Sequence, residues 1–285
     1  MKTPTHLYST SKHADELLFK DSTPAGTEYF EEDFGDYSLE ARIVYNQNHD
    51  KPWVLSVHGA LSDFTKSNAV TFGLQERGFS QLGLNMSGHS PAGVLEPEQT
   101  TLGNNVHETA QFYEYLDDTR PTVVIASSLG GTPGLKLLEK HSDQIGKLIL
   151  FYPGIYTRSA YDKHFGQEFR DAISEPYSYR DNDTIELLQA YKGDLLLIKG
   201  EYDGLDGEDY GKHAGGSAGT VTIDGAEYYS PIPKEVIDMV YDAVPEGRRE
   251  MIEVPKCGHS VVLWMRDHPM EAEKLLDQIR DFLEG

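Results

Sequence analysis

The chain has 285 residues, of which 38% are hydrophobic, and its 25 basic and 47 acidic residues give a net charge of 25 − 47 = −22. The length and apolar content suffice for one large α/β domain or two small ones. The acidic excess, with no run of Lys and Arg to offset it, argues against binding to nucleic acid or to an anionic membrane.

The single cysteine and the first residues of the chain indicate a cellular compartment. Cys257 alone excludes an internal disulfide and a multi-cysteine zinc site. The first twenty residues contain no apolar run typical of a signal peptide. We therefore expect a soluble, cytoplasmic protein.

Strand-like and helix-like segments alternate from about residue 26 onwards, whereas the residues before it have no clear period and are expected to form an extension or an edge segment. Residues 27 to 33 and 38 to 46 are β-prone and fit an antiparallel hairpin. Apolar strand-like runs then recur at 53–57, 80–86, 122–126, 146–151, 194–199 and 250–254, and helical periods at 65–77, 105–117, 129–141, 233–243 and 267–283. This alternation predicts one domain, residues 1–285, built on a mostly parallel sheet covered on both faces.

Two segments interrupt this alternation. Residues 153–191 hold many aromatic residues without a sustained apolar stripe, which is typical of a lid or cap insertion. Their rings could line a substrate pocket, but for most of them we favour packing of the segment onto the body of the domain. Residues 204–229 are rich in Gly and Asp and contain one β-prone run, Thr220 to Ile223, that fits a small hairpin.

The segment that is most informative for chemistry is a strand-like run that leads through a turn into a helix-like run at residues 121–141. The turn reads small-x-Ser-x-small at Ala126, Ser128 and Gly130. Small residues are required there because a tight turn brings the strand and helix backbones together and pushes the serine outwards. A serine at this position can also be a helix N-cap, so its assignment as a nucleophile depends on partners elsewhere in the chain.

Two other serines fit this pattern less well. Ser127 would be flanked by the large residues Ile125 and Leu129. A literal Gly-x-Ser-x-Gly surrounds Ser217, but no apolar strand precedes it, and the run that follows is strand-like where a helix should begin. We interpret that stretch as a glycine-rich loop.

A serine nucleophile needs a base and an acid that orients the base. His259 follows the last strand-like run, near the carboxyl edge of the expected sheet, where catalytic loops gather. Asp203 follows the penultimate run. Together with Ser128 they form a candidate triad in the chain order Ser, Asp, His.

The negative charge that develops on an attacked carbonyl needs backbone N–H donors. The amide of Leu129, just after the serine, is one candidate. Ala60 is the other, because Gly59 allows the loop after the third strand to bend and present the next N–H. We expect His58 to brace this loop rather than to act as a second base.

These segments together resemble the α/β-hydrolase superfamily over roughly residues 27–283. The matching motifs are His58-Gly-Ala60, Asn85-Met-Ser-Gly-His-Ser90, Ala126-Ser-Ser-Leu-Gly-Gly131, Gly200-Glu-Tyr-Asp203 and Gly258-His259. The resemblance implies the α/β-hydrolase fold, with a mostly parallel eight-stranded sheet flanked by helices, a lid insertion at 153–191 and a second insertion at 204–229.

The sequence departs from the family pattern in three places. Ala126 stands where Gly is commoner, and Asn85 and Ser87 replace the Asp and Arg of a common loop, so that loop must be braced differently. Family members often follow the acid with a Pro-rich entry to a helix, which residues 230–235 resemble. The segment between is then an insertion, and either Asp203 or Asp206 orients the histidine.

The resemblance implies a serine hydrolase that cleaves a carboxylic ester or thioester of a small-to-medium acyl substrate, with no metal or organic cofactor. No His-Glu-x-x-His, Gly-x-Gly-x-x-Gly or Gly-Lys-Ser/Thr motif occurs in the sequence. The alternatives are an acyltransferase or a carbon–carbon bond hydrolase or lyase with the same triad, and a non-catalytic ligand-binding protein on this fold. A homo-oligomer is compatible with the sequence.

Overall fold

Eight strands form one sheet in the computed structural model, which describes residues 2–204 and 219–285. Their order is β1-β2-β4-β3-β5-β6-β7-β10, with antiparallel pairs β1·β2 and β2·β4 and parallel pairs from β4 onwards. The predicted mostly parallel eight-stranded sheet is therefore confirmed. The strands are β1 (Thr27–Asp33), β2 (Ser38–Val44), β3 (Val54–Val57), β4 (Gln81–Leu84), β5 (Thr122–Ser127), β6 (Ile145–Phe151), β7 (Asp194–Gly200) and β10 (Arg249–Val254).

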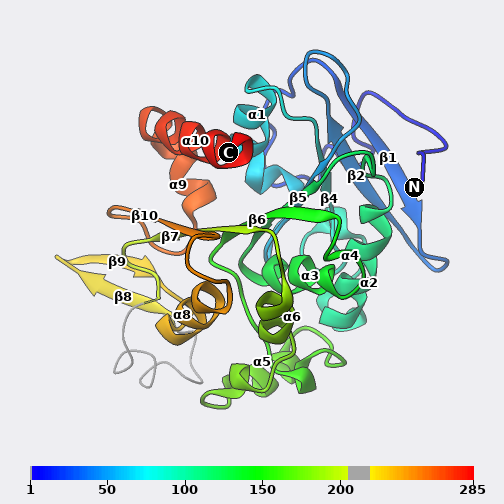
Figure 1. Cartoon of the computed structure of the whole chain (residues 1–285). Coiled ribbons are helices and arrows are strands. Elements are labelled where there is room, and N and C mark those ends of the chain that lie inside the picture. The colour runs from blue at the N-terminus through cyan, green and yellow to red at the C-terminus, as the bar shows by residue number, and fades with distance from the viewer. Residues whose placement is uncertain (1, 205–218) are drawn as a thin grey trace.

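Helices cover both faces of this sheet because side chains along its central strands alternate between two apolar layers (Figure 1). In β5, Val124 and Ala126 belong to one layer, and Val123 and Ile125 to the other. One face carries α1 (Asn68–Glu76), α9 (Val261–Asp267) and α10 (Pro269–Glu284). The other carries α2 (Leu102–Tyr113), α3 (Gly131–Lys136), α4 (Leu138–His141), α6 (Thr184–Ala190) and α8 (Lys234–Ala243).

Most helices lie where the helical periods placed them, but one is divided and three were not predicted: α9, and α5 (Gln167–Ser174) and α6 within residues 153–191. The expected helix at 129–141 is divided into α3 and α4 at Leu137. Helix α9, which directly follows the His259 loop, was not predicted, since its short apolar run carries no helical period that separates it from a strand. Among residues 2–204 and 219–285, no helix has both the length and the apolar composition to cross a membrane.

The N-terminal segment runs along the β1 edge of the sheet and is fixed there by polar contacts. Tyr8 forms a bridge with Tyr29 of β1. The wholly buried carboxylate of Glu40 accepts hydrogen bonds from the Tyr8 hydroxyl at 3.0 Å, the Ser11 hydroxyl at 2.5 Å and the Lys12 N–H at 2.8 Å. These residues behave as an edge segment, one of the two forms expected for them.

The two segments that interrupt the alternation differ in structure. Residues 153–191 contain α5 (Gln167–Ser174) and α6, and their rings Phe165, Phe169, Tyr179 and Tyr191 are buried in the layer that α2, α3 and α8 share. The assignment of this segment as a lid stays a prediction. In the second segment, β8 (Thr220–Ile223) and β9 (Ala226–Tyr229) form an antiparallel hairpin whose turn, Asp224-Gly225, has positive φ at both residues.

Candidate active site

Ser128 occupies a strained turn between β5 and α3. Its φ is +51°, in the left-handed region that L residues rarely adopt. Gly130 is confined by the neighbouring loop, because a Cβ at that position would lie 2.2 Å from the carbonyl oxygen of His58. The structure therefore gives a physical reason for a small residue two positions after Ser128, and the turn projects the serine away from the sheet.

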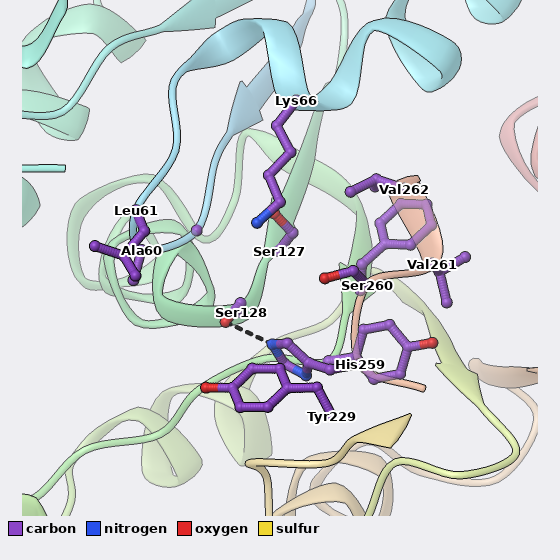
Figure 2. A pocket seen from close by; sticks show the side chains of 13 residues that line it. Ala60, Leu61, Lys66, Ser127, Ser128, Tyr229, His259, Ser260, Val261 and Val262 are labelled. Carbon is purple, nitrogen blue, oxygen red and sulfur yellow. Dashed lines mark hydrogen bonds between the residues drawn. The ribbon is translucent and has the colours of Figure 1, made fainter. Parts of the chain in front are cut away.

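A chain of hydrogen bonds joins Ser128, His259 and Asp203, and Figure 2 shows its link between Ser128 and His259. The Nε2 atom of His259 lies 2.8 Å from the Ser128 Oγ, and its Nδ1 lies 2.6 Å from the Asp203 Oδ2. Asp203 is wholly buried, and its Oδ1 accepts the N–H of Gly204 at 3.0 Å. If Nδ1 donates its proton to the carboxylate, Nε2 is free to accept the serine proton, which is the arrangement that activates a serine nucleophile.

The backbone and ring of His259 are held by residues that the sequence did not single out. Its N–H donates to the carbonyl oxygen of Tyr229, the last residue of β9, at 2.7 Å. The Tyr229 ring meets the imidazole edge-on with centroids 5.5 Å apart, and the Tyr152 ring lies 5.1 Å away on a tilted plane. Both tyrosines are distant from His259 in the sequence, so no periodicity or spacing could have indicated these contacts.

The loop that carries Ala60 passes directly beside the serine. A Cβ on Gly59 would lie 2.9 Å from the Ser128 Cβ, so only glycine allows this approach. Within residues 2–204 and 219–285, neither the Ala60 N–H nor the Leu129 N–H donates a hydrogen bond to the protein. Two unpaired amides beside a serine are the donors that an oxyanion hole requires.

His58 braces this loop, as expected. Its Nε2 accepts the N–H of Met86 at 2.9 Å, so the proton resides on Nδ1, which donates to the carbonyl oxygen of Gly59 at 2.8 Å. Burial lowers the pKa of the His58 imidazole to about 4, so the ring stays neutral near pH 7. A neutral ring with both nitrogens engaged is suited to positioning the loop, not to proton transfer.

A buried carboxylate braces the loop in which Asn85 and Ser87 replace the residues common in the family. Glu108 of α2 is wholly buried and accepts the Ser87 N–H at 3.0 Å and the Ser87 hydroxyl at 2.5 Å. The Tyr37 hydroxyl donates to the same carboxylate at 2.7 Å. Asn85 accepts the N–H of Phe64 at 3.0 Å. The different bracing expected from the sequence therefore comes from α2 and the β3–α1 loop.

A cavity of about 200 Å³ opens onto Ser128 and His259. Figure 2 shows that Lys66 and Ser260 also reach into it. None of residues 154–191 lines this cavity, so the buried rings of that segment pack against the domain instead. The lining comprises Gly59, Ala60, Leu61, Lys66, Ser127, Ser128, Phe151, Tyr152, Tyr229, His259, Ser260, Val261 and Val262.

The remaining candidates from the sequence are placed as follows. Ser127 lines the cavity, but the imidazole of His259 contacts the hydroxyl of Ser128 instead. Asp206 and Ser217 lie outside the described residues. In the described part of the chain, no three His, Cys, Asp or Glu side chains are grouped so that they could hold a metal ion.

Several solved structures are similar to this chain over most of its length. Est1E from Butyrivibrio proteoclasticus is 16% identical with a TM-score of 0.59, covering 90% of this chain and 97% of its own. A thermophilic esterase from Thermogutta terrifontis is 17% identical with a TM-score of 0.56, and the match covers 87% of this chain and 94% of the esterase. A thioesterase domain from the curacin biosynthetic pathway is 15% identical with a TM-score of 0.57, and the match covers 88% of this chain and 98% of the thioesterase domain. No family model matches the sequence, and no curated protein matches it.

The chain has the α/β-hydrolase fold. Within this fold, the segments that the resemblance singled out converge at the carboxyl edge of the sheet, after β3, β5, β7 and β10. Close packing there requires further glycines. A Cβ on Gly200, at the end of β7, would lie 2.2 Å from the carbonyl oxygen of Cys257. The loop that carries His259 can therefore rest directly on the end of the strand that precedes Asp203.

Proposed function

We propose that this α/β-hydrolase fold carries a serine hydrolase that cleaves a small carboxylic ester or thioester through an acyl-enzyme on Ser128. The observation that supports it is the unbroken path of hydrogen bonds from the buried Asp203 through His259 to Ser128, at the mouth of a cavity. The solved structures of similar fold include a thermophilic esterase and a thioesterase domain.

The proposed reaction has two halves. His259 Nε2 takes the proton of Ser128 as Oγ attacks the substrate carbonyl, and the amides of Ala60 and Leu129 bind the oxyanion that forms. The tetrahedral intermediate collapses, and the alcohol or thiol leaves with the proton from His259. Water, deprotonated by the same imidazole, then attacks the acyl-enzyme and releases the carboxylic acid and the free serine.

Labelling with a fluorophosphonate probe, together with hydrolysis of 4-nitrophenyl acetate, tests the proposal. The wild-type protein should be labelled at Ser128 and should hydrolyse the ester. Ser128→Ala should abolish both with an unchanged thermal unfolding midpoint, because it removes one hydroxyl at the edge of a cavity. Ser217→Ala, at the literal Gly-x-Ser-x-Gly, is the matched control and should retain both.

Three results distinguish the remaining candidates. Labelling that survives in Ser128→Ala but is lost in Ser217→Ala would contradict the assignment of the nucleophile. Absence of labelling in the wild type, under conditions that label a control esterase, would favour a ligand-binding protein. Diversion of product to a new ester when an alcohol acceptor is added would indicate an acyltransferase.

A further inference from the structure

Lys66 brings a positive charge into the cavity beside the nucleophile. It lies on the 3-10 turn Phe64–Ser67, whose other residues are buried, and its side chain extends into the cavity toward Ser127 and Ser128 (Figure 2). Among the described residues that line the cavity, it is the only Lys, Arg, Asp or Glu. The cavity therefore contains one lysine and no carboxylate among its described lining residues, although the whole chain has a net charge of −22.

The ammonium group has no acid of its own in the described part of the chain. The carboxylate that acts on it, Asp63, already accepts the N–H of Thr65 at 2.8 Å on one oxygen and the N–H of Leu18 at 2.8 Å on the other. Lys66 forms no ion pair with any described residue. Burial accordingly lowers the pKa of its ammonium group, and the Asp63 charge opposes this only in part. A partly desolvated cation without a partner is a site where an anion gains binding energy.

We propose that Lys66 binds a carboxylate of the substrate, so that the substrate class is an ester or thioester with a carboxylate a few bonds from the scissile carbonyl. This inference rests on the proposed hydrolysis at Ser128. A monoanion fits better than a phosphate dianion because one lysine faces the cavity and no second Lys or Arg lines it among the described residues. The volume of about 200 Å³ suits a short chain, since cavities for larger ligands occupy about 300–1,000 Å³.

Matched pairs of charged and neutral esters test this assignment. Monoethyl glutarate carries the carboxylate on the acyl side, and 3-acetoxypropanoate carries it on the alcohol side. Each is compared with its carboxamide, which has nearly the same shape and no charge. The ratio of kcat/KM for the acid to kcat/KM for its amide isolates the contribution of the charge, and the two pairs show on which side of the ester it is bound.

We expect wild-type protein to prefer the acid in one of the two pairs. Lys66→Met keeps the length of the side chain without its charge, and it should lower that ratio by about 10- to 100-fold, as expected for one charged hydrogen bond. Activity on the amide should remain within about threefold. Lys66→Arg keeps the charge and should retain most of the preference. Lys192→Met, an exposed lysine just before β7 and away from the cavity, changes the net charge equally and should leave the ratio unchanged.

Two results would overturn the inference while the proposed hydrolysis stands. One is a wild-type protein that hydrolyses acid and amide equally well in both pairs. The other is a Lys66→Met protein that loses activity equally on acid and amide, because Lys66 would then act on a group common to both, such as the oxyanion.

Failure of the proposed function would be recognised separately, by the absence of both ester hydrolysis and fluorophosphonate labelling. Calorimetric titration of the protein with glutarate then decides the role of Lys66 without turnover. Binding that weakens about 10-fold or more in Lys66→Met but not in Lys192→Met supports the anion site, and absence of glutarate binding overturns it.

Discussion

Replacing Asp203 with asparagine tests the triad through the position of a single proton. The Asp203 Oδ1 accepts the N–H of Gly204 at 3.0 Å, so the carbonyl oxygen of an asparagine would occupy that position. Its NH₂ group would then face His259 Nδ1, which lies 2.6 Å from the present Oδ2. An NH₂ donor forces Nδ1 to accept and places the ring proton on Nε2. That nitrogen could then no longer accept the proton of Ser128.

The expected loss in kcat is about 10⁴-fold, the size that the same change produces in a serine-protease triad. This corresponds to about 5.5 kcal/mol of transition-state stabilisation. Steady-state hydrolysis of 4-nitrophenyl acetate measures it, and circular dichroism checks that the fold is retained. Glu201→Gln is the matched control, because Glu201 lies two residues away and its carboxylate accepts the Lys256 N–H at 2.8 Å outside the triad. Its activity should stay within about twofold of wild type.

The same assay on Asp206→Asn addresses the alternative acid. We expect nearly unchanged turnover, because Asp203 already occupies the Nδ1 side of the imidazole. Wild-type-like activity in Asp203→Asn, combined with a large loss in Asp206→Asn, would refute the assignment of the acid and with it the tautomer argument.

Two further predictions concern buried parts of the fold. Gly130→Ala would place a carbon 2.2 Å from the His58 carbonyl oxygen, so we expect it to lower the free energy of unfolding by about 1–3 kcal/mol in urea denaturation. Gly134→Ala, whose added carbon meets the Ala126 methyl at 3.0 Å, should cost less, and equal losses would contradict the steric argument. Burial lowers the pKa of His89 to about 3, whereas the pKa of a histidine in the unfolded chain is near 6.5. The folded state with its neutral His89 is therefore fully stable above pH 6.5 and loses stability as the pH falls toward 3, because the unfolded chain then binds a proton that the folded chain does not. We expect the free energy of unfolding to fall by about 2 kcal/mol between pH 7 and pH 5, and we expect His89→Gln to remove this fall. If the free energy of unfolding of that variant depended on pH as in the wild type, the prediction for His89 would be wrong.

The sheet was predictable because its central strands are apolar on both faces. Each residue of β7 from Leu195 to Ile198 is buried, two in each apolar layer, so the run is visible in the sequence without any alignment. The boundaries of the helices were harder to predict from the sequence. The stretch after Ser128 contains Gly131, Pro133 and Gly134, which are weak helix formers, and the helix there ends at Lys136 and restarts at Leu138.

The candidate triad was predictable for a different reason. Its members lie at the ends of three recognisable strands, and the chemistry of a serine nucleophile requires a base and an acid, so each residue narrowed the choice of the next. Lys66 had no such constraint. It is one lysine in a polar turn, and its position beside Ser128 results from the path of the β3–α1 loop over the sheet edge. Residues that select a substrate lie on such loops and carry no periodic signal.

The hairpin β8–β9 shows how a segment that interrupts the alternation can still belong to the site. It lies between Asp203 and α8 in the sequence, yet the carbonyl oxygen of Tyr229 at its end accepts the N–H of His259. A Cβ on Gly258 would lie 2.9 Å from that same oxygen, so the hairpin requires the glycine before His259. The end of the hairpin therefore meets the loop that carries His259 at two adjacent residues, Gly258 and His259. The hairpin supports His259 in this way, a role that the composition of residues 204–229 alone did not indicate.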